Sequence, residues 1–233
     1  MNSEPYPTLI FVRHAQSEGN VLTVAERAEM QIGTTAYRLT SLGRRQATCT
    51  HDWLQKNFPN PDRVIRSYYQ RTAETAKLCY PEEEVREDAR LAEANRGVYT
   101  ILGPNGVKEK MPWETVRRER DGLYHYCPPG GENWPMIESR IRDFRRSIRS
   151  RYPGKTVVVF GHGFWILLWQ KLTHHWTIEE TERRYLADEI VENASVLIYR
   201  NEWNSVINRH ILQHDPSTDY IVPWKNILPH VST

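Results

Sequence analysis

The sequence predicts an α/β fold, a three-layer sandwich with a mainly parallel sheet, an antiparallel edge strand and a lid-like insertion. Two short apolar runs, Leu9–Val12 and Thr156–Phe160, are typical of strands that are buried on both faces. Segments with helical periodicity alternate with these and other short strands along the chain, as in βαβ units. The first run ends abruptly in Arg13, His14 and small polar residues, so we expect a loop at the carboxyl edge of the sheet, and the second ends in Gly161-His162-Gly163 before a helical run.

The first half of the chain supplies several elements between these runs. Val21–Ile32 is expected to form a short helix or an ordered excursion. A helix begins at Thr40 or Ser41, which would cap it, and runs to about Phe58, where Pro59 ends it. The elements that follow are a short strand at Arg63–Ser67, a helix over about Gln70–Cys79, and a strand around Val85 that leads to Leu91.

The second half begins with a segment of poor periodicity, Asn95–Pro135, in which glycine and proline recur. We interpret it as a lid-like insertion at about 95–135 that shapes a pocket, with one helix at Trp113–Arg120. The elements after it are an amphipathic helix with Ile137, Ile141, Phe144 and Ile148 inside, helices at Phe164–Trp169 and Ile178–Leu186, and edge-hairpin strands at Ala194–Arg200 and Trp203–Ile211 with a turn at Asn201–Asn204.

Composition narrows the class of protein. The 233 residues are 39% apolar and 26% charged, with a net charge of +2, which is typical of one globular domain, 1–233. Three widely spaced cysteines favour reduced thiols over disulfides. With no leader pattern and no apolar run of membrane-spanning length, we expect a cytoplasmic protein without a membrane partner. The arginines of the amphipathic helix, Arg140, Arg142, Arg145, Arg146 and Arg149, are interpreted as a solvated face, because no nucleic-acid motif accompanies them.

A histidine follows each of the two apolar runs. His14 comes after Arg13, and His162 lies between Gly161 and Gly163. Ligands of open α/β sheets bind at the carboxyl ends of strands, and the amides that begin the next helix favour an anion. The alternatives are an ordinary surface or capping Arg-His pair and a core strand that ends in a glycine turn.

Two further residues are candidates for the same edge. Arg71 falls in the first turn of its predicted helix, where its charge opposes the helix dipole unless an anion lies there. A solvated arginine is the alternative. Glu93 follows Leu91 and Ala92, and from the residues alone it is better interpreted as a surface glutamate.

Together these motifs resemble the histidine phosphatase superfamily, which includes phosphoglycerate mutases. The resemblance rests on Arg13–Asn20, Ser67–Ala76, Leu91-Ala92-Glu93 and Gly161-His162-Gly163, in the family's order. It implies the same fold and a reaction in which His14 attacks phosphorus and becomes a phosphohistidine. Glu93 would act as the general acid and base. The phosphoryl group would be held by Arg13, Arg71, His162, Asn20 and the Gly163 amide, with Ser17 and Arg96 as further substrate-binding residues. No metal or cofactor is expected.

The sequence departs from the mutases after the acid. There the mutases carry Arg, an aromatic residue or His, Tyr and Gly, whereas Glu93 is followed by Ala94, Asn95, Arg96 and Gly97. We therefore expect a metal-independent phosphatase whose partner is a small phosphorylated metabolite. Alternatives are a cofactor-dependent phosphoglycerate mutase and a regulatory phosphate-binding protein with little turnover. A nucleic-acid partner is not expected, and a homodimer is left open.

Overall fold

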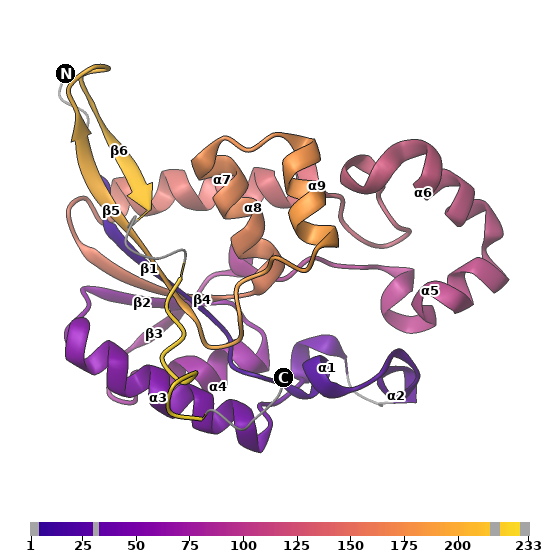
Figure 1. Ribbon diagram of the computed structural model, residues 1–233, viewed down its shortest axis with the longest axis horizontal. Helices are drawn as coiled ribbons and strands as arrows, with labels where there is room; N and C mark the ends of the chain where they lie inside the picture. Colours follow the sequence, from indigo (N-terminus) through magenta and orange to yellow (C-terminus); the bar gives the residue numbers. More distant parts are fainter. Residues whose placement is uncertain (1–4, 30–32, 215–219, 229–233) are drawn as a thin grey trace.

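The protein is built around one mixed sheet of six strands (Figure 1). A computed structural model describes residues 5–29, 33–214 and 220–228. The strand order is β3-β2-β4-β1-β5-β6, in which β3, β2, β4 and β1 are parallel and β5 and β6 are antiparallel. The strands are β1 Thr8–Arg13, β2 Arg63–Arg66, β3 Val85–Glu87, β4 Thr156–Gly161, β5 Val196–Asn204 and β6 Arg209–His214. The predicted mainly parallel sheet with an antiparallel edge is confirmed.

The register of the central strands sets the position of the histidines. In the parallel pair β1 and β4, Arg13 lies opposite Gly161. On the other side of β4, Arg66 of β2 lies opposite Phe160. Because these strands are parallel and in register, the residues that follow them leave the sheet at the same edge. Those residues are His14, His162 and Ser67.

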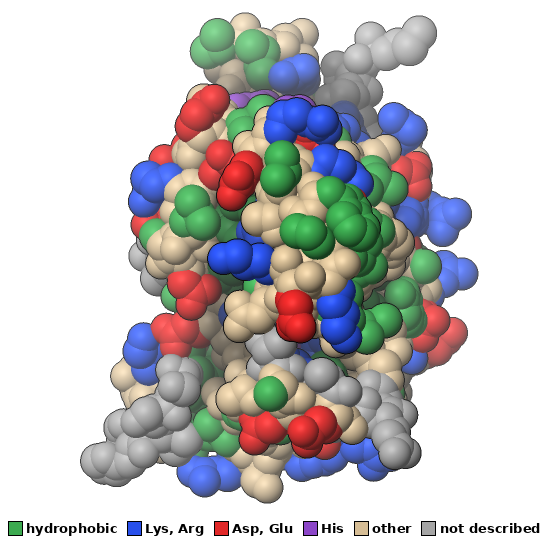
Figure 2. All heavy atoms as spheres, turned by 90° about the vertical axis from the view of Figure 1, so that its right-hand side faces the viewer, with side chains coloured by type: hydrophobic (Ala, Val, Ile, Leu, Met, Phe, Trp, Pro, Cys, Tyr) green, Lys and Arg blue, Asp and Glu red, His purple; other side chains and the backbone are tan. Residues whose placement is uncertain are grey.

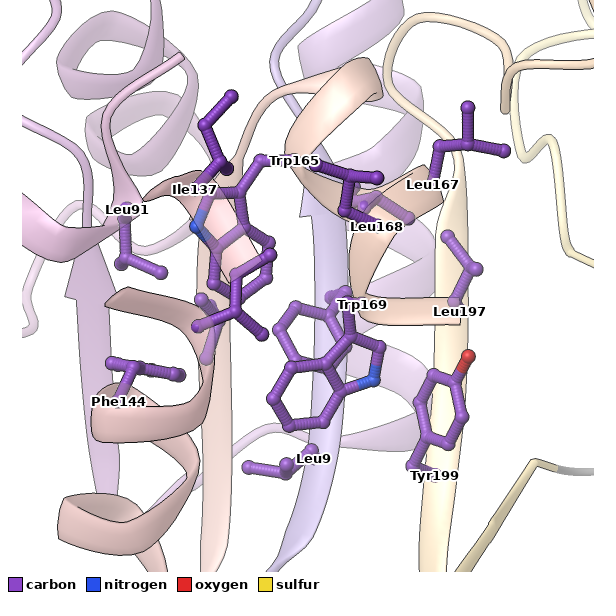
Figure 3. Close-up of a cluster of buried hydrophobic side chains, with 14 of the residues drawn as sticks. Leu9, Leu91, Ile137, Phe144, Trp165, Leu167, Leu168, Trp169, Leu197 and Tyr199 are labelled. Carbon is purple, nitrogen blue, oxygen red and sulfur yellow. The ribbon is translucent and has the colours of Figure 1, made fainter. Parts of the chain in front are cut away.

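Each strand at the centre sends alternate side chains to two separate cores. Leu9 and Phe11 of β1 pack with α7 Trp134–Arg151 and α8 Gly163–His174, where the Trp165 and Trp169 rings stack at 5.7 Å (Figure 3). Ile10 and Val12 pack on the other face, which α3 Ser41–Asn57 and α4 Gln70–Cys79 cover (Figure 1). This is the predicted three-layer arrangement.

Most predicted helices lie at their expected positions. The Thr40 hydroxyl accepts from the Gly43 amide and caps α3 as predicted. Helices α4 and α9 Ile178–Leu186 have the predicted bounds. The short elements are α1 Glu18–Val21, α2 Val24–Glu29, η1 Thr34–Ala36 and η2 Ala89–Leu91; the end of the predicted Val21–Ile32 element, 30–32, lies outside the described residues.

The insertion contains more helix than predicted. Besides α6 Pro112–His125, which includes the predicted 113–120, it forms α5 Val98–Lys110. Gly103, with a φ of +64°, makes a kink, and Pro104 follows it, so residues that normally break helices lie at the one point where α5 is broken. Both helices extend beyond the end of the sheet (Figure 1). Hydrophobic side chains are visible on that end in Figure 2, and three exposed ones are Ile101, Trp113 and Val116.

The turn of the edge hairpin lies later in the chain than predicted. Strand β5 continues to Asn204, and the turn covers 205–208. The Asn204 carboxamide oxygen accepts from the Val206 and Ile207 amides, and Asn208 has a φ of +50°. Asparagine stabilises this kind of turn, so the chain reverses between Asn204 and Asn208 rather than between Asn201 and Asn204.

Among the described helices, none has both the length and the hydrophobicity that crossing a membrane requires.

Candidate active site

His14 is buried and held by the backbone around it. It is only 4% exposed, and its amide donates to the Gly161 carbonyl at 3.0 Å. The Nδ1 atom lies 2.8 Å from the Ala15 carbonyl, and Nε2 lies 3.0 Å from the Arg71 Nε–H. A carbonyl can only accept and a guanidinium can only donate. Nδ1 therefore carries the proton, and the lone pair of Nε2 faces Arg71.

The same reasoning fixes the tautomer of His162, which is fully buried. The Arg71 Nη2 atom lies 3.1 Å from His162 Nδ1, so this nitrogen is the acceptor. His162 Nε2 then carries the proton and donates to the Ser67 hydroxyl at 3.0 Å. The two imidazole rings are 5.3 Å apart. Both histidines thus direct a lone pair toward one guanidinium.

Arg71 lies between the two histidines because α4 begins beside the ends of β1 and β4. Its third nitrogen, Nη1, donates to the Thr34 carbonyl at 2.9 Å. Its guanidinium lies 4.5 Å from the centre of the Tyr69 ring, which also packs edge-on against His162. These contacts leave Arg71 only 8% exposed. The helix dipole disfavours a cation at this end, and the two imidazole lone pairs and the carbonyl offset that cost.

Arg13 lies on the other side of the site and is less completely bonded. Its Nη1 donates to the Val191 carbonyl. Its Nε is buried with no hydrogen-bond partner among the described residues. A Cβ atom on Gly163 would lie 2.6 Å from Cγ2 of Ile190 and 3.1 Å from both Nε and Cζ of Arg13. Glycine at 163 therefore makes room for the guanidinium beside the first amides of α8, which have no acceptor within the helix.

Burial and the nearby cations keep both histidines neutral. Burial lowers the pKa of His14 well below its usual 6.5, and the positive charges of Arg71 and Arg13 lower it further. Burial, Arg71 and the neighbouring His14 do the same to the pKa of His162. Burial also lowers the pKa values of Arg13 and Arg71. The site therefore concentrates positive charge around an unprotonated, nucleophilic imidazole nitrogen.

Glu93 belongs to the same electrostatic cluster. Among charged neighbours, its carboxylate is the one that most strongly raises the pKa values of Arg13 and Arg71, against the effect of burial. Its Oε1 accepts from the Ala94 amide at 3.0 Å. The Glu93 carboxylate is therefore close enough to both guanidinium groups to stabilise their charge.

Arg140 of α7 holds the segment that carries Glu93. Its guanidinium donates to the carbonyls of Arg90, Ala92 and Glu93 at 2.9, 2.7 and 3.4 Å. The same group pairs with Glu132 at 2.9 Å, and its side chain is only 17% exposed. The interpretation of Arg140 as part of a solvated face is therefore wrong, because its side chain is mostly buried and bonded to Glu132 and to carbonyls about fifty residues earlier in the chain.

The sequence matches the family model of the histidine phosphatase superfamily (branch 1) over residues 9–206. The chain belongs to the histidine phosphatase superfamily. A 2,3-bisphosphoglycerate-dependent phosphoglycerate mutase from Chelativorans sp. (strain BNC1) is 30% identical over 163 residues, 67% of this chain and 76% of the mutase.

Solved structures of other proteins share the fold. The alpha-ribazole phosphatase from Shigella flexneri superposes with a TM-score of 0.67 at 19% identity, covering 90% of this chain and 96% of that one. A mycobacterial glucosyl-3-phosphoglycerate phosphatase complexed with VO3 gives 0.67 at 23% identity, covering 90% and 97%. The family resemblance and the fold class predicted from the sequence are confirmed.

Three residues expected to bind substrate in this member of the superfamily have other surroundings. The Asn20 carboxamide oxygen accepts from both the amide and the hydroxyl of Ser17, at 2.9 and 3.0 Å. Ser17 is buried and Asn20 is exposed, so the pair closes the loop after β1 at the start of α1. Arg96 is exposed, and its side chain forms no hydrogen bond or ion pair with the described residues, although its carbonyl accepts from the Tyr99 amide at 3.1 Å. The structure thus brings together His14, His162, Arg13, Arg71 and Glu93, but it does not join Asn20, Ser17 or Arg96 to them by contact.

Several residues that support the site were given no role from the sequence. The Asn193 carboxamide donates to the His14 carbonyl at 2.9 Å, and the Thr75 hydroxyl accepts from the Ala15 amide at 3.0 Å. Ser67 and Tyr69 contact His162, as described above. Ser67, Tyr69 and Thr75 all lie in the motif segment that contains Arg71, so that motif carried the signal. In the described part of the chain, no group of three or more His, Cys, Asp or Glu side chains is arranged to bind a metal.

Proposed function

We propose that this protein is a phosphatase that hydrolyses small phosphate monoesters without a metal, through a phosphohistidine on His14. The observation that carries the proposal is the hydrogen-bond pattern of His14. Its Nδ1 proton is committed to the Ala15 carbonyl, so Nε2 is unprotonated, and this nitrogen faces Arg71. An imidazole nitrogen in that state is the nucleophile that a phosphoryl group requires.

Substrate binding begins with an exchange of hydrogen bonds. In the free site the guanidinium of Arg71 covers the lone pair of His14 Nε2. A phosphoryl dianion is a stronger acceptor for guanidinium than a neutral imidazole is, because charge-assisted bonds are about twice as strong. The dianion takes the Nε–H of Arg71 and the unpaired Nε–H of Arg13, and the phosphorus then lies in front of the exposed nitrogen.

Bond making and breaking follow in two steps. The Nε2 lone pair attacks phosphorus and the ester P–O bond breaks. The Glu93 carboxyl group, which takes up a proton from solvent when the dianion binds beside it, gives that proton to the leaving oxygen. Glu93, now a carboxylate, takes a proton from water as that water attacks the phosphohistidine. The P–N bond breaks, its electron pair returns to Nε2, and inorganic phosphate leaves. His162, close to the bound anion, donates to a phosphoryl oxygen once it is protonated.

The energetic demand requires all of these groups. Hydrolysis of phosphate monoesters is among the slowest uncatalysed reactions, so the barrier must fall by on the order of 20 kcal/mol. General acid catalysis contributes roughly 10²- to 10⁴-fold, which is a few kcal/mol. Positioned positive charge and the covalent intermediate supply the rest. The buried guanidinium groups of Arg13 and Arg71 serve this purpose because little water screens them.

The segment after Glu93 favours hydrolysis over phosphoryl return to a glycerate. The Asn95 carboxamide bonds to the Gly130 carbonyl and to the Gly97 amide, at 3.1 and 2.9 Å. Gly97 has a φ of +52° and packs against the backbone of Pro129. The Asn95 carboxamide and the Gly97 backbone therefore hold this loop against the insertion. Arg96, between them, is exposed. No carboxylate-binding group of the mutase type is evident among residues 94–97.

A phosphoglycerate mutase is the second candidate, favoured by the name of the relative that is 30% identical. It would transfer phosphate between positions of phosphoglycerate and depend on a bisphosphoglycerate. Incubation with 3-phosphoglycerate distinguishes the two functions. Release of inorganic phosphate supports the phosphatase, whereas isomerisation stimulated by bisphosphoglycerate supports the mutase.

The phosphatase proposal is tested by trapping the intermediate. Rapid quenching with radiolabelled substrate should leave acid-labile, base-stable label on the protein, and His14→Ala should remove both the label and the hydrolysis. If His14→Ala still hydrolyses aryl phosphates at the wild-type rate, the mechanism is wrong. The regulatory alternative with little turnover fails once the wild-type protein hydrolyses any phosphate ester through His14.

The role of Glu93 is tested separately by the choice of leaving group. Glu93→Gln should lower kcat for alkyl phosphates by roughly 10²- to 10⁴-fold, because their leaving oxygens need a proton. For p-nitrophenyl phosphate the phosphorylation step should be nearly unaffected, since p-nitrophenolate leaves without one. Equal losses in burst rate for both substrate types would exclude Glu93 as the acid.

A further inference from the structure

A second concentration of positive charge lies on α7, away from the histidines. A cavity of about 490 Å³ is lined by Tyr6, Arg142, Arg145, Arg146, Arg149 and Ser150, which we call the basic groove. Tyr6 precedes β1, whereas His14 follows it, so the groove lies toward the opposite edge of the sheet (Figure 1). Six strand residues at about 3.3 Å each separate the two places by roughly 20 Å.

The lining of the basic groove holds four guanidinium groups and, among the described residues, no carboxylate. The four arginines are spaced i, i+3, i+4 and i+7, so they share one face of α7. Like charges at these spacings repel one another. Such a face is unfavourable by itself, and a bound anion would relieve the repulsion.

Neighbouring carboxylates compensate this charge only in part. Glu138 bonds Arg142 at 2.8 Å but is shared with Lys171, also at 2.8 Å. Asp143 lies 4.0 Å from Arg146 and is bonded more closely, at 2.7 Å, by Arg90. Each of these two carboxylates therefore serves a second cation, so among the described residues the positive charges at the groove outnumber the negative ones.

Arg145 has no acidic partner in the described part of the chain. Its guanidinium lies over two aromatic rings, 5.6 Å from the centre of Tyr6 and 5.8 Å from that of Trp169. Arg149 lies 4.4 Å from the same Tyr6 ring and donates to its hydroxyl at 3.2 Å. Stacking uses the face of the Arg145 guanidinium and leaves N–H groups at its edge for an anion. Tyr69 holds Arg71 in the same way, at 4.5 Å.

We propose that the basic groove is a binding site for a small compound with two or more phosphate groups, separate from the catalytic site. Guanidinium groups match phosphate in a two-pronged geometry. From Arg142 to Arg149 the helix rises about 10 Å, enough for neighbouring phosphates of one ligand. The cavity volume lies in the range of small-molecule sites. A nucleic acid fits less well, because the Tyr6 ring already carries guanidinium groups and is not free to stack on a base.

Calorimetric titration of the full chain with tripolyphosphate tests the site at about 0.15 M salt, where surface charge is screened as in cells. Inhibition of aryl phosphate hydrolysis by tripolyphosphate reports the catalytic site alone. We expect the wild-type titration to fit only with two sites: the catalytic site, whose dissociation constant equals that inhibition constant, and a second site in the basic groove. Arg145→Gln/Arg149→Gln should weaken the second site about 100-fold, about tenfold for each lost charge-assisted contact, and leave kcat/KM unchanged.

The matched control is Arg183→Gln/Arg184→Gln on α9, which removes the same net charge elsewhere and should bind tripolyphosphate as the wild type does. Arg145→Lys/Arg149→Lys keeps the charge, and with it the local fold, and should bind with intermediate affinity. A wild-type titration with one site, or equal binding by the two Gln double variants, would overturn the proposal. So would a single-stranded oligonucleotide that binds the groove more tightly than tripolyphosphate does.

Discussion

The buried histidines should make the folded protein less stable as the pH falls. In the folded protein the pKa values of His14 and His162 lie well below 6.5, mainly because both are buried and also because Arg71 is near. In the unfolded chain they return to about 6.5. When the pH falls below about 6.5, the unfolded chain therefore binds two protons that the folded protein does not, and the free energy of unfolding falls.

The magnitude follows from proton linkage. Between about pH 7.5 and about pH 5.5, each histidine that stays neutral in the folded state costs about 1.4 kcal/mol of stability, and the pair about 2.7 kcal/mol. Carboxylates with lowered pKa values, such as Glu180 at about 2, contribute little in this window, because their unfolded values lie near 4.5. Among the described groups whose pKa changes on folding, the two site histidines should thus account for most of the loss in this window.

Urea unfolding followed by tryptophan fluorescence measures this loss. His14→Gln and His162→Gln should each remove about half of the pH dependence, whatever they do to stability at pH 7.5. Tungstate, a phosphate-like dianion, should flatten the wild-type dependence, because its charge raises the pKa values of nearby histidines. A dependence of the same size in the wild type and both variants would refute the neutral, buried state of the pair.

Three further predictions concern single residues around the histidines. Arg71→Lys should lower kcat/KM on p-nitrophenyl phosphate roughly 10²- to 10³-fold, because one ammonium cannot replace three directed donors; activity within a few-fold of wild type would contradict this. Gly163→Ala should lower kcat, since its Cβ would lie 2.6 Å from Ile190 Cγ2 and 3.1 Å from the Arg13 guanidinium and would displace both, whereas Gly33→Ala, with its nearest neighbour at 3.7 Å, should not; steady-state kinetics of both variants decide it. Arg140→Gln should slow alkyl phosphates more than p-nitrophenyl phosphate, because it frees the Glu93 segment, and Arg140→Lys should restore part of the loss; an equal effect on both substrates would assign Arg140 to stability alone.

Local sequence pattern was enough to place the elements that carry the histidines. The two apolar runs became β1 and β4, and the bounds of α4 were predicted as found, because strand burial and helix spacing are properties of consecutive residues. The pattern missed α5, where Gly103 and Pro104 interrupt the helical signal at a kink. Which strands are neighbours is not a local property, and the family motifs supplied that information instead.

The contacts of the α7 arginines could not be predicted from the local sequence pattern. From the sequence they form one basic face, but in the structure Arg140 turns to the backbone carbonyls of Arg90 and Ala92, while Arg142–Arg149 surround the basic groove. The partners of Arg140 come from a segment about fifty residues earlier. Helical periodicity predicts which side of a helix faces the core. It does not predict which backbone segments, distant in the sequence, contact the side chains at the edge of that side.

The position of Arg71 in the first turn of α4 predicts a bound anion, because a cation at a helix start opposes the helix dipole. In the free protein the cost is already offset by lone pairs of His14 and His162 and by the Thr34 carbonyl. Two of these three acceptors are the imidazoles that a phosphoryl group would have to reach. Binding must therefore break the contacts of Arg71 with the histidines, while the Thr34 carbonyl can still hold the guanidinium beside the phosphate. In the proposed mechanism Arg71 thus protects the nucleophile until a dianion arrives, and the affinity for a dianion is lowered by the free energy of those two hydrogen bonds.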